Sequence, residues 1–549
     1  SMTDDKSMTD DKSNDNKQGM LEFIIEPKSI FGKKYLGDMS KHTTTDKSFL
    51  KDTQGILKHY PKLQQDVDLH SKVANMWSSI INNEDLVSKF KYIDIPYFQN
   101  LNNSSIFLQL LSLYNLSSPL LFFIVPFVML IIPFFILKFK KLNVSFNSYI
   151  SLLKKVLKNH TLGLLLNMNY KEINWGTAIY AIGSIGFYIF QIYQNIVSCF
   201  NYYKNMKDIH DHIFTMKLFL METTSNICIM EQVYTKYNTY KSFNETMNIA
   251  KSNMNKYIQD LQYITPMSIN ISKLTQLGNI MKQFYMFFKN DHFRSTIDYA
   301  FQINGHMDYM INIKRLINDG KINACKFGKC TKMKSAYYPK LMHDKYVSND
   351  FDFNKNLIIT GPNAAGKTTL IKTTIINIIL SQQFGYGFYR SATINPYHQI
   401  HSYLNIPDTS GRDSLFQAEA RRCNEIIQDF NNNAKQRHFC IFDELYSGTN
   451  PYEAVGSAYG FLKYICNRPN IDFMITTHYN QLCILMKNNV NIINKHMKIR
   501  INEDKYQFDY TYKLGTGISQ IKGGFKVLND LQYPQELLDS IEEISNELI

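Results

Sequence analysis

The feature that most constrains the fold is a glycine-rich stretch, GPNAAGKTT, at residues 361–369. The apolar run 356–360 precedes it and a helical pattern over 368–380 follows, so the sequence predicts a strand, a tight loop and a helix in succession. Gly361 and Gly366 have the spacing G-x-x-x-x-G-K-T of a phosphate-binding loop. The expected fold class for this part of the chain is therefore an α/β P-loop domain, with a mainly parallel sheet flanked by helices.

The positions of this loop have expected roles in holding ATP and Mg²⁺. Glycines allow backbone N–H groups to close around phosphates, Lys367 should reach the β- and γ-phosphate oxygens, and the Thr368 hydroxyl should bind the magnesium ion. The predicted nucleotide-binding set is Gly361, Pro362, Asn363, Ala364, Ala365, Gly366, Lys367, Thr368 and Thr369.

Two further apolar strands end in polar side chains. The run 438–442 leads to Asp443, a second magnesium ligand acting through water, and to Glu444, which can orient or deprotonate an attacking water. The run 473–477 leads to His478, at the sheet edge where parallel strands bind ligands, where it could sense the γ-phosphate. An isolated acidic pair or histidine is usually structural, but beside such a loop we predict catalytic roles for Glu444, His478 and Lys367.

These motifs together resemble the ATPase domain of the MutS mismatch-repair family. The resemblance is carried by GPNAAGKTT, DELYSGTNPYEA at 443–454 and THY at 477–479. Flanking matches are Tyr338-Pro339, Val347-Ser348-Asn349-Asp350, Tyr512-Lys513-Leu514, Gly517-Ile518-Ser519, Gly523-Gly524 and Pro534. The resemblance covers about 340–545 and implies an ABC-like, Mg-dependent ATP hydrolase. Ala364 and Ala365 depart from the residues most members carry, without blocking phosphate binding.

The segment 410–423 resembles the stretch in which this family places a serine against the partner subunit's nucleotide. Ser414, five residues before Glu419, takes that position. The resemblance implies a second MutS-like ATPase subunit, with a homodimer expected, and Ser414 acting in trans. Ser414 could also simply cap its own helix, and both roles are compatible.

The DNA partner rests on the resemblance and on charge. Sixty basic against 47 acidic residues give a net charge of +13, which suits nucleic acid or an anionic membrane, although the Lys-rich composition could supply it without a dedicated face. Phe243-Asn244-Glu245 has the letters of the family's mismatch-reading wedge. We reject it, because it lies in a helical region and 37 phenylalanines make such triplets common. Eight cysteines do not form a disulfide scaffold, and Cys325 and Cys330 lack a second pair at zinc spacing.

Two apolar runs indicate a membrane. Residues 119–137 hold no charge or amide and have the length needed to cross a bilayer, and the weaker run 176–199 contains three spaced glycines. We therefore predict a hydrophobic helical hairpin at 118–199, with a buried helix pair as the alternative. The lysine-rich loop between the runs conflicts with two full crossings, because the ATPase must meet cellular ATP. A hairpin entering one leaflet, with a basic interfacial helix at 145–165, satisfies both constraints; the alternative is that the charge bias is misleading.

The rest of the chain divides by pattern. The expected parts are a mostly disordered tail at 1–50, a helical segment at 51–117, the hairpin at 118–199, a helical lever and core region at 200–335 and the ATPase domain at 336–549. No secretory signal opens the sequence, so the expected location is intracellular and membrane-associated, with the ATPase domain on the cytoplasmic or nucleoplasmic side. The first functional hypothesis is an ATP-driven dimeric clamp on DNA related to mismatch repair. The alternative is a membrane-tethered mechanochemical scaffold without mismatch recognition, and an ATP-driven transporter is disfavoured because no LSGGQ-like motif occurs.

Overall fold

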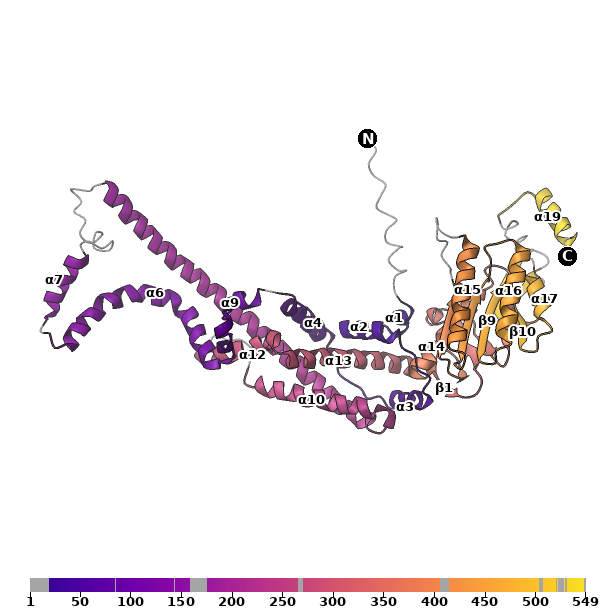
Figure 1. Ribbon diagram of the computed structural model, residues 1–549, viewed down its shortest axis with the longest axis horizontal. Helices are drawn as coiled ribbons and strands as arrows, with labels where there is room; N and C mark the ends of the chain where they lie inside the picture. The colour runs from indigo at the N-terminus through magenta and orange to yellow at the C-terminus, as the bar shows by residue number, and fades with distance from the viewer. Residues whose placement is uncertain are drawn as a thin grey trace. The chain divides into compact units, whose positions relative to one another are not determined.

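A computed structural model gives the architecture shown in Figure 1. It describes residues 19–83, 85–142, 144–157, 175–264, 270–404, 414–502, 507–519, 521, 528 and 531–547. Two compact units result: an α/β unit made of Ser1–Leu63, Cys228–Thr246 and Asn304–Ile549, and a helical unit made of Gln64–Ile227 and Met247–Ile303. A helical N-terminal region and a C-terminal mixed α/β region are thus both present, as predicted.

The α/β unit is built on a six-stranded sheet in the order β11-β10-β4-β9-β8-β7. Its strands are β4 (Asn356–Thr360), β7 (Gln399–Tyr403), β8 (His438–Asp443), β9 (Ile471–Thr477), β10 (Ile492–Asn502) and β11 (Gln507–Thr516). Neighbouring strands are parallel except for β10 and β11, which pair antiparallel at the edge. The mainly parallel sheet is confirmed, and the fully buried β4 fits a central strand covered on both faces.

A second sheet of five short strands has the order β3-β2-β6-β1-β5. Its members are β1 (Asn323–Phe327), β2 (Lys332–Ala336), β3 (Asn349–Asp352), β5 (Tyr386–Gly387) and β6 (Ser391–Ile394). The predicted boundary at residue 336 is therefore wrong, because β1 and β2 lie in the stretch expected to be helical. Their short alternation of buried and exposed residues is weaker than the helical stripes that precede it.

Helices and the smaller sheet cover the two faces of the six-stranded sheet. One apolar core joins it to α14 (Lys367–Phe384) and the smaller sheet, through Ile371, Ile359 and Phe351. The other core joins the opposite face to α15 (Leu415–Asn432), α16 (Pro451–Cys466) and α17 (Asn480–Met486). Successive strand side chains alternate between the two cores, as the pleat requires.

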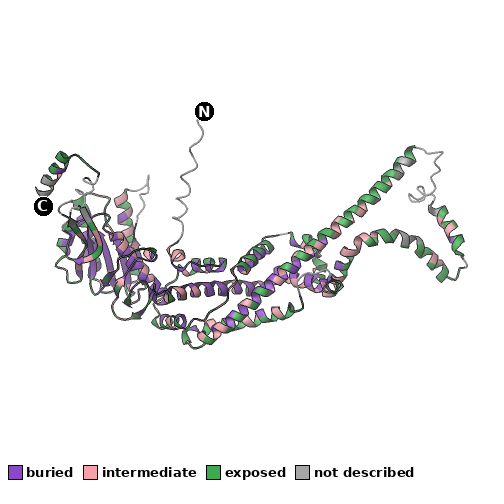
Figure 2. Ribbon diagram, turned by 180° about the vertical axis from the view of Figure 1, so that it is seen from behind, coloured by how far each residue is buried: buried purple, intermediate pink, exposed green. Residues whose placement is uncertain are grey.

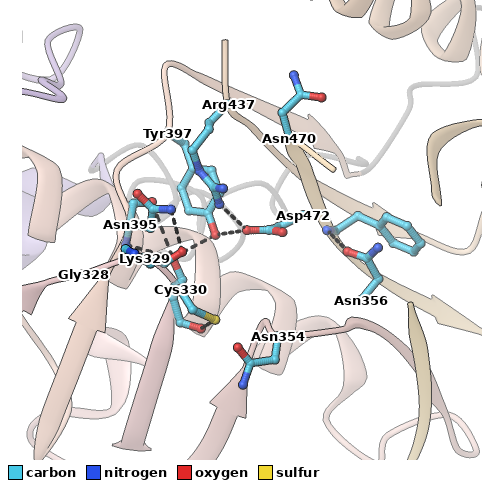
Figure 3. A network of polar contacts seen from close by, with 12 residues as sticks. Gly328, Lys329, Cys330, Asn354, Asn356, Asn395, Tyr397, Arg437, Asn470 and Asp472 are labelled. Atoms are coloured by element: carbon cyan, nitrogen blue, oxygen red, sulfur yellow. Dashed lines mark hydrogen bonds and ion pairs between the residues drawn. The ribbon is translucent and has the colours of Figure 1, made fainter. Parts of the chain in front are cut away.

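A partly buried polar network lies between the two sheets (Figure 3). Asp472 on β9 accepts hydrogen bonds from Arg437 Nη2 at 2.6 Å and from the Tyr397 hydroxyl at 2.7 Å. The Tyr397 oxygen lies 2.9 Å from the Thr331 hydroxyl, next to β2, and the Arg437 guanidinium lies over the Tyr397 ring. Burial raises the pKa of Asp472, and the two donors oppose that effect. The Asp472 carboxylate thus binds the segments that precede β7 and β8, and Tyr397 extends the network to Thr331, next to β2.

Three N-terminal helices belong to the α/β unit: α1 (Met20–Ile25), α2 (Ile30–Met39) and α3 (Lys47–Lys58). The predicted tail of 1–50 is therefore wrong from residue 20 onward, and residues 1–18 lie outside the described residues. The helices α1 and α2 are short, with six and ten residues, but α1 buries Ile24 and Ile25 completely. Ser29 donates backbone and side-chain hydrogen bonds to Asp308, and Gln54 donates to the carbonyl of Cys325. Hydrogen bonds between residues so far apart in the chain cannot be predicted from a local sequence pattern.

The helical unit confirms the amphipathic stripes. Its elements are α4 (Val67–Ile81), α5 (Leu86–Lys89), η1 (Pro96–Asn103), α6 (Ser105–Phe139), α7 (Phe146–Leu157), α11 (Ile271–Leu274) and α12 (Leu277–Lys289). Three longer helices have residues in both units: α9 (Trp175–Tyr234), α10 (Lys241–Asp260) and α13 (Asp291–Asn318). The predicted core positions Ile209, Ile213 and Met216 on α9 are completely buried, as is Met254 on α10.

The first apolar run lies in α6, whose N-terminal part packs on α12. Ser112 on α6 contacts Met281 on α12, and a Cβ on Gly278 would come within 2.0 Å of the Ser105 carbonyl, so glycine is needed for this close approach. Beyond this base, α6 exposes large apolar side chains (Figure 2). One helix among the described residues is long and apolar enough to cross a membrane, at Ser105–Val125. The run 176–199 lies in α9, where Phe122 of α6 stacks on Tyr188, and 158–174 lies outside the described residues.

Candidate functional site

The loop between β4 and α14 has the backbone conformation that its glycines allow. Gly361 and Gly366 have φ values of 154° and 92°, in the region that L side chains rarely adopt. A Cβ on Gly361 would lie 3.1 Å from Met497, and one on Gly366 would lie 3.1 Å from the Tyr512 ring. Ala364 also has a positive φ, of 62°, so the loop is held in a strained form. Its tip, at Asn363 and Ala364, is exposed.

Lys367 begins α14 and turns its ammonium group back into the loop. Its Nζ donates to the carbonyls of Gly361 at 2.9 Å and Pro362 at 3.3 Å. The residue is 5% exposed, and this burial lowers the pKa of Lys367, while the carboxylates of Glu444 and Asp443 act in the opposite direction. The ammonium group thus lies against the backbone of the predicted phosphate-binding loop.

Asp443, the last residue of β8, connects the loop helix to the neighbouring strand. Its Oδ2 accepts a hydrogen bond from the Thr368 hydroxyl at 2.8 Å, and its Oδ1 accepts one from the Thr476 hydroxyl on β9. The two predicted magnesium ligands, Thr368 and Asp443, are therefore adjacent. Their oxygen atoms are the type of donor that Mg²⁺ prefers, so this pair fits that ion. Thr476 was not predicted, because a buried strand threonine gives no distinct pattern.

Glu444 and His478 form a close pair at the ends of β8 and β9. His478 Nε2 lies 2.7 Å from Glu444 Oε1 and 3.2 Å from Lys367 Nζ. The hydrogen bond from His478 lowers the pKa of Glu444, so the carboxylate is ionised and His478 Nε2 must be the donor. The same nitrogen cannot then accept from Lys367. Glu444 has φ of 58°, a strained conformation fixed by its N–H bond to the Thr476 carbonyl. The three predicted catalytic side chains are thus brought together.

A cavity of about 540 Å³ adjoins this cluster. Residues 362–370 and Glu444 line its polar side. Its other walls come from residues that sequence reasoning did not assign to the site: Tyr338, Leu341, Lys345, Val347, Asn349, Met497 and Tyr512. Tyr338, Val347, Asn349 and Tyr512 lie in the flanking motifs that carry the MutS resemblance, so those motifs could have predicted that these residues line the site. The Asn349 side chain donates to the Tyr512 carbonyl and accepts from the Leu514 N–H. These two hydrogen bonds hold β3 against β11.

Ser414 lies at the N-cap of α15 and does not line the cavity. Its hydroxyl accepts from the N–H of Gln417 at 3.3 Å and its own N–H donates to the Gln417 side chain, a capping box. The side chain is nevertheless exposed. The capping role is confirmed, and the role in trans stays a prediction.

Glu419, five residues after Ser414 on α15, is buried, and its role in the site was not predicted. Its carboxylate accepts from the N–H and hydroxyl of Ser447 at 3.1 and 3.0 Å, and from the N–H of Gly448 at 3.2 Å. These residues follow Glu444 in the turn between β8 and α16. Glu419 therefore joins α15 to the segment that carries Glu444.

Comparison with known proteins shows a similarity over the C-terminal region. Residues 357–549 match the model of MutS domain V. The C-terminal region of this chain is thus similar to domain V of the MutS family. The DNA mismatch repair protein MutS of Persephonella marina is 28% identical over 218 residues, which cover 39% of this chain and 24% of the relative. The DNA mismatch repair protein Msh3 of Homo sapiens is 29% identical over 223 residues, covering 37% and 19%. The chain thus spans a quarter or less of the length of these MutS relatives.

The triplet at Phe243 does not form a mismatch-reading wedge of MutS type. The Phe243 ring packs against Tyr234 and His306, with ring centroids 5.4 Å apart in both pairs. Asn244 is buried. An aromatic engaged in packing of this kind is not free to insert beside a base, which agrees with the rejection made from the sequence.

Proposed function

We propose that this chain is a Mg-dependent ATP hydrolase of MutS type that works as a dimer on DNA. The observation that carries the proposal is the convergence of Lys367, Thr368, Asp443, Glu444 and His478 at one end of the parallel sheet. That edge, beyond the carboxyl ends of β4, β8 and β9, is where ligands of parallel sheets bind.

The loop supports triphosphate binding. The N-terminal amides of α14 and the ammonium group of Lys367 supply positive charge to phosphates. Lys367 Nζ now donates to the Gly361 and Pro362 carbonyls, and phosphate oxygens would replace these acceptors. The apolar wall at Tyr338, Leu341 and Val347 offers a surface for the base.

The Glu444 carboxylate supports hydrolysis. It stays ionised because its pKa is lowered, so it can orient and deprotonate a water at neutral pH. Thr368 and Asp443 would hold Mg²⁺, which supplies charge neutralisation for the phosphate oxygens. His478 fixes the orientation of Glu444 through its hydrogen bond and lies beside Lys367, where it would sense the γ-phosphate.

Nucleotide binding and turnover by the purified full chain test this proposal. Lys367→Ala should abolish ATP binding, whereas Lys355→Ala, an exposed lysine before β4, should leave binding unchanged. Binding can be measured with a fluorescent ATP analogue and turnover by phosphate release. If the wild-type chain with magnesium neither binds nor hydrolyses ATP, the proposal fails.

The exposed Ser414 supports a composite site in which each subunit completes the other's. The N-terminus of α15 favours an anion, and the capping box leaves the hydroxyl accessible to solvent. Mixing provides the test. Ser414→Asp and Lys367→Ala should each be inactive alone, and their random heterodimers should restore about a quarter of wild-type turnover, because half the dimers then hold one intact site. No recovery on mixing, with heterodimers demonstrated, would remove the role in trans.

DNA is the proposed cargo, and the proposed role is related to mismatch repair, as the names of the relatives suggest. The net charge of +13 favours a polyanion. Because Phe243 is engaged in packing, we expect similar affinities for homoduplex and heteroduplex DNA, falling steeply with salt. Fluorescence anisotropy at two salt concentrations would measure both. A strong preference for a mismatch would establish a reading element elsewhere in the chain.

Membrane attachment is a second candidate function, favoured by α6. The span Ser105–Val125 is only 11% buried, and Leu120 and Phe135 are each more than half exposed. In this alternative, the chain is an intracellular, membrane-tethered MutS-like scaffold whose ATPase faces the cytoplasm or nucleoplasm.

Carbonate extraction and vesicle flotation of the full chain test the membrane. The double variant Leu120→Lys and Phe135→Lys should lose flotation, because lysine is costly in hydrocarbon. Leu537→Lys, at an exposed position of α19 (Gln535–Glu547), is the matched control. Release of wild-type protein into the supernatant would refute membrane attachment.

A further inference from the structure

A second cluster of metal-ligating side chains lies away from the proposed nucleotide cavity. It consists of His401 on β7, His438 at the start of β8 and Asp429 on α15. His401 on β7 lies opposite Cys440 on β8. Since residues two apart on a strand point to the same face, His438 shares the face of Cys440 and His401, and this face is the one that packs against α15. We propose that these three residues bind a first-row divalent metal ion, with zinc as the expected ion.

The separations of the ligand atoms suit a tetrahedral ion. His401 Nε2 lies 3.1 Å from His438 Nδ1 and 3.6 Å from Asp429 Oδ2. Two ligands each about 2.0–2.1 Å from zinc at the tetrahedral angle are about 3.3 Å apart. All three ligand atoms lie within 4.8 Å of one another, and the 37%-exposed Asp429 side chain has room to close the longest gap.

The hydrogen bonds around the cluster are those of an oriented metal site. His438 Nε2 lies 3.1 Å from the carbonyl of Asn433, which can only accept, so Nε2 carries the proton and Nδ1 presents its lone pair to the cluster. The Asn433 side-chain amide donates to Asp429 Oδ1 at 2.8 Å, leaving Oδ2 toward His401. One residue thus orients two ligands, as outer-shell partners of bound metals do.

The cluster is partly shielded from solvent and is also open to it through a cavity. His438 is completely buried, and the Phe430 ring packs edge-on against both imidazoles. A cavity of about 280 Å³, lined by His401, Asp429 and Glu425 among others, reaches the cluster from outside. It leaves room for a water as the fourth ligand, the usual partner of three protein ligands. The bound ion would tie α15 to the edge strand β7 and to β8.

Metal binding by the purified, untagged full chain tests the proposal, with no nucleotide present and magnesium in excess. Zinc stoichiometry is measured by elemental analysis after equilibration and zinc affinity by competition with a chromophoric chelator. Cobalt serves as the spectroscopic probe, because the chain has eight free cysteines and thiolate ligands would show a charge-transfer band. We expect one ion per chain and a tetrahedral cobalt spectrum without that band.

Two variants that preserve the local hydrogen bonds identify the ligands. His401→Gln can still donate to His438, and Asp429→Asn can still accept from Asn433. Each should weaken zinc binding by about 100-fold or more, since even outer-shell changes cost 10–100-fold. His398→Gln, which removes a nearby exposed imidazole, should leave the affinity unchanged.

Two results would overturn the assignment: no zinc at one ion per chain, or wild-type affinity in both ligand variants. If circular dichroism shows that a variant is unfolded, X-ray absorption of the zinc-loaded wild-type chain decides. Imidazole scattering in a nitrogen and oxygen shell supports the site, and a sulfur-dominated shell refutes it. The outcome is independent of ATP hydrolysis.

Discussion

Replacing Glu444 by Gln should separate nucleotide binding from hydrolysis. The substitution removes a charge and keeps the shape, and the glutamine oxygen can still accept the hydrogen bond that His478 now donates at 2.7 Å. Lys367 Nζ lies 3.8 Å from Glu444 Oε1 and keeps its bonds to the Gly361 and Pro362 carbonyls. Neither the loop nor the pocket wall therefore depends on the carboxylate charge.

The expected magnitude follows from the role of a general base. Proton abstraction by a positioned base contributes about 10²–10⁴-fold, equal to roughly 3–5 kcal/mol of activation free energy. The kcat of Glu444→Gln should fall by that factor, while ATP affinity stays equal or improves because a negative charge near the phosphates is removed. The slow turnover should also trap ATP-bound dimers.

Single-turnover phosphate release and equilibrium ATP binding measure the two quantities separately, and size-exclusion chromatography with ATP reports the dimer. Glu26→Gln is the matched control, because it removes an exposed carboxylate paired with Arg315 at 2.7 Å. A Glu444→Gln protein that hydrolyses ATP at the wild-type rate would remove Glu444 from the base role. Loss of ATP binding would show that the carboxylate instead maintains the pocket.

Other residues give three further expectations. His478 lowers the pKa of Glu444, so His478→Ala should raise that pKa and move the acid limb of the kcat profile to higher pH; an unmoved limb would contradict the assigned hydrogen bond. The lowered pKa of Glu444 also contributes to the free energy of unfolding. That contribution is complete above the pKa of Glu444 in the unfolded chain and is lost as the pH falls through its lower pKa in the folded chain. Ser414→Asp should preserve the cap and the urea midpoint while abolishing turnover, whereas Ser414→Ala should lose about 0.5–2 kcal/mol of stability. Phe442→Ala, at a completely buried position of β8 next to Asp443, should lower the free energy of unfolding in urea by about 3–5 kcal/mol, and a smaller loss would mean that the core collapses around the substitution.

Much of the candidate site was predictable because its chemistry is local in sequence. The loop at Gly361–Lys367 is one continuous motif, and Asp443, Glu444 and His478 each end an apolar strand. Since parallel strands place their carboxyl ends at one edge, the convergence of these side chains follows from the pattern alone.

The remaining features depend on long-range contacts that no local pattern encodes. The start of α2 is held by Asp308, which accepts hydrogen bonds from Ser29, almost 280 residues away in sequence. The strands β1 and β2 have only five residues each, too few for a clear alternation. The His401, Asp429 and His438 cluster is assembled from two strands and a helix without any ligand spacing that a motif could reveal.

The contacts of Glu419 have a mechanical consequence. Its buried carboxylate holds Ser447 and Gly448, three and four residues after Glu444, while its own helix begins at the exposed Ser414. A displacement of that helix start would therefore be transmitted through one buried side chain to the turn that follows Glu444. In the proposed dimer, a partner subunit that contacts Ser414 would thus alter the position of the segment that carries Glu444.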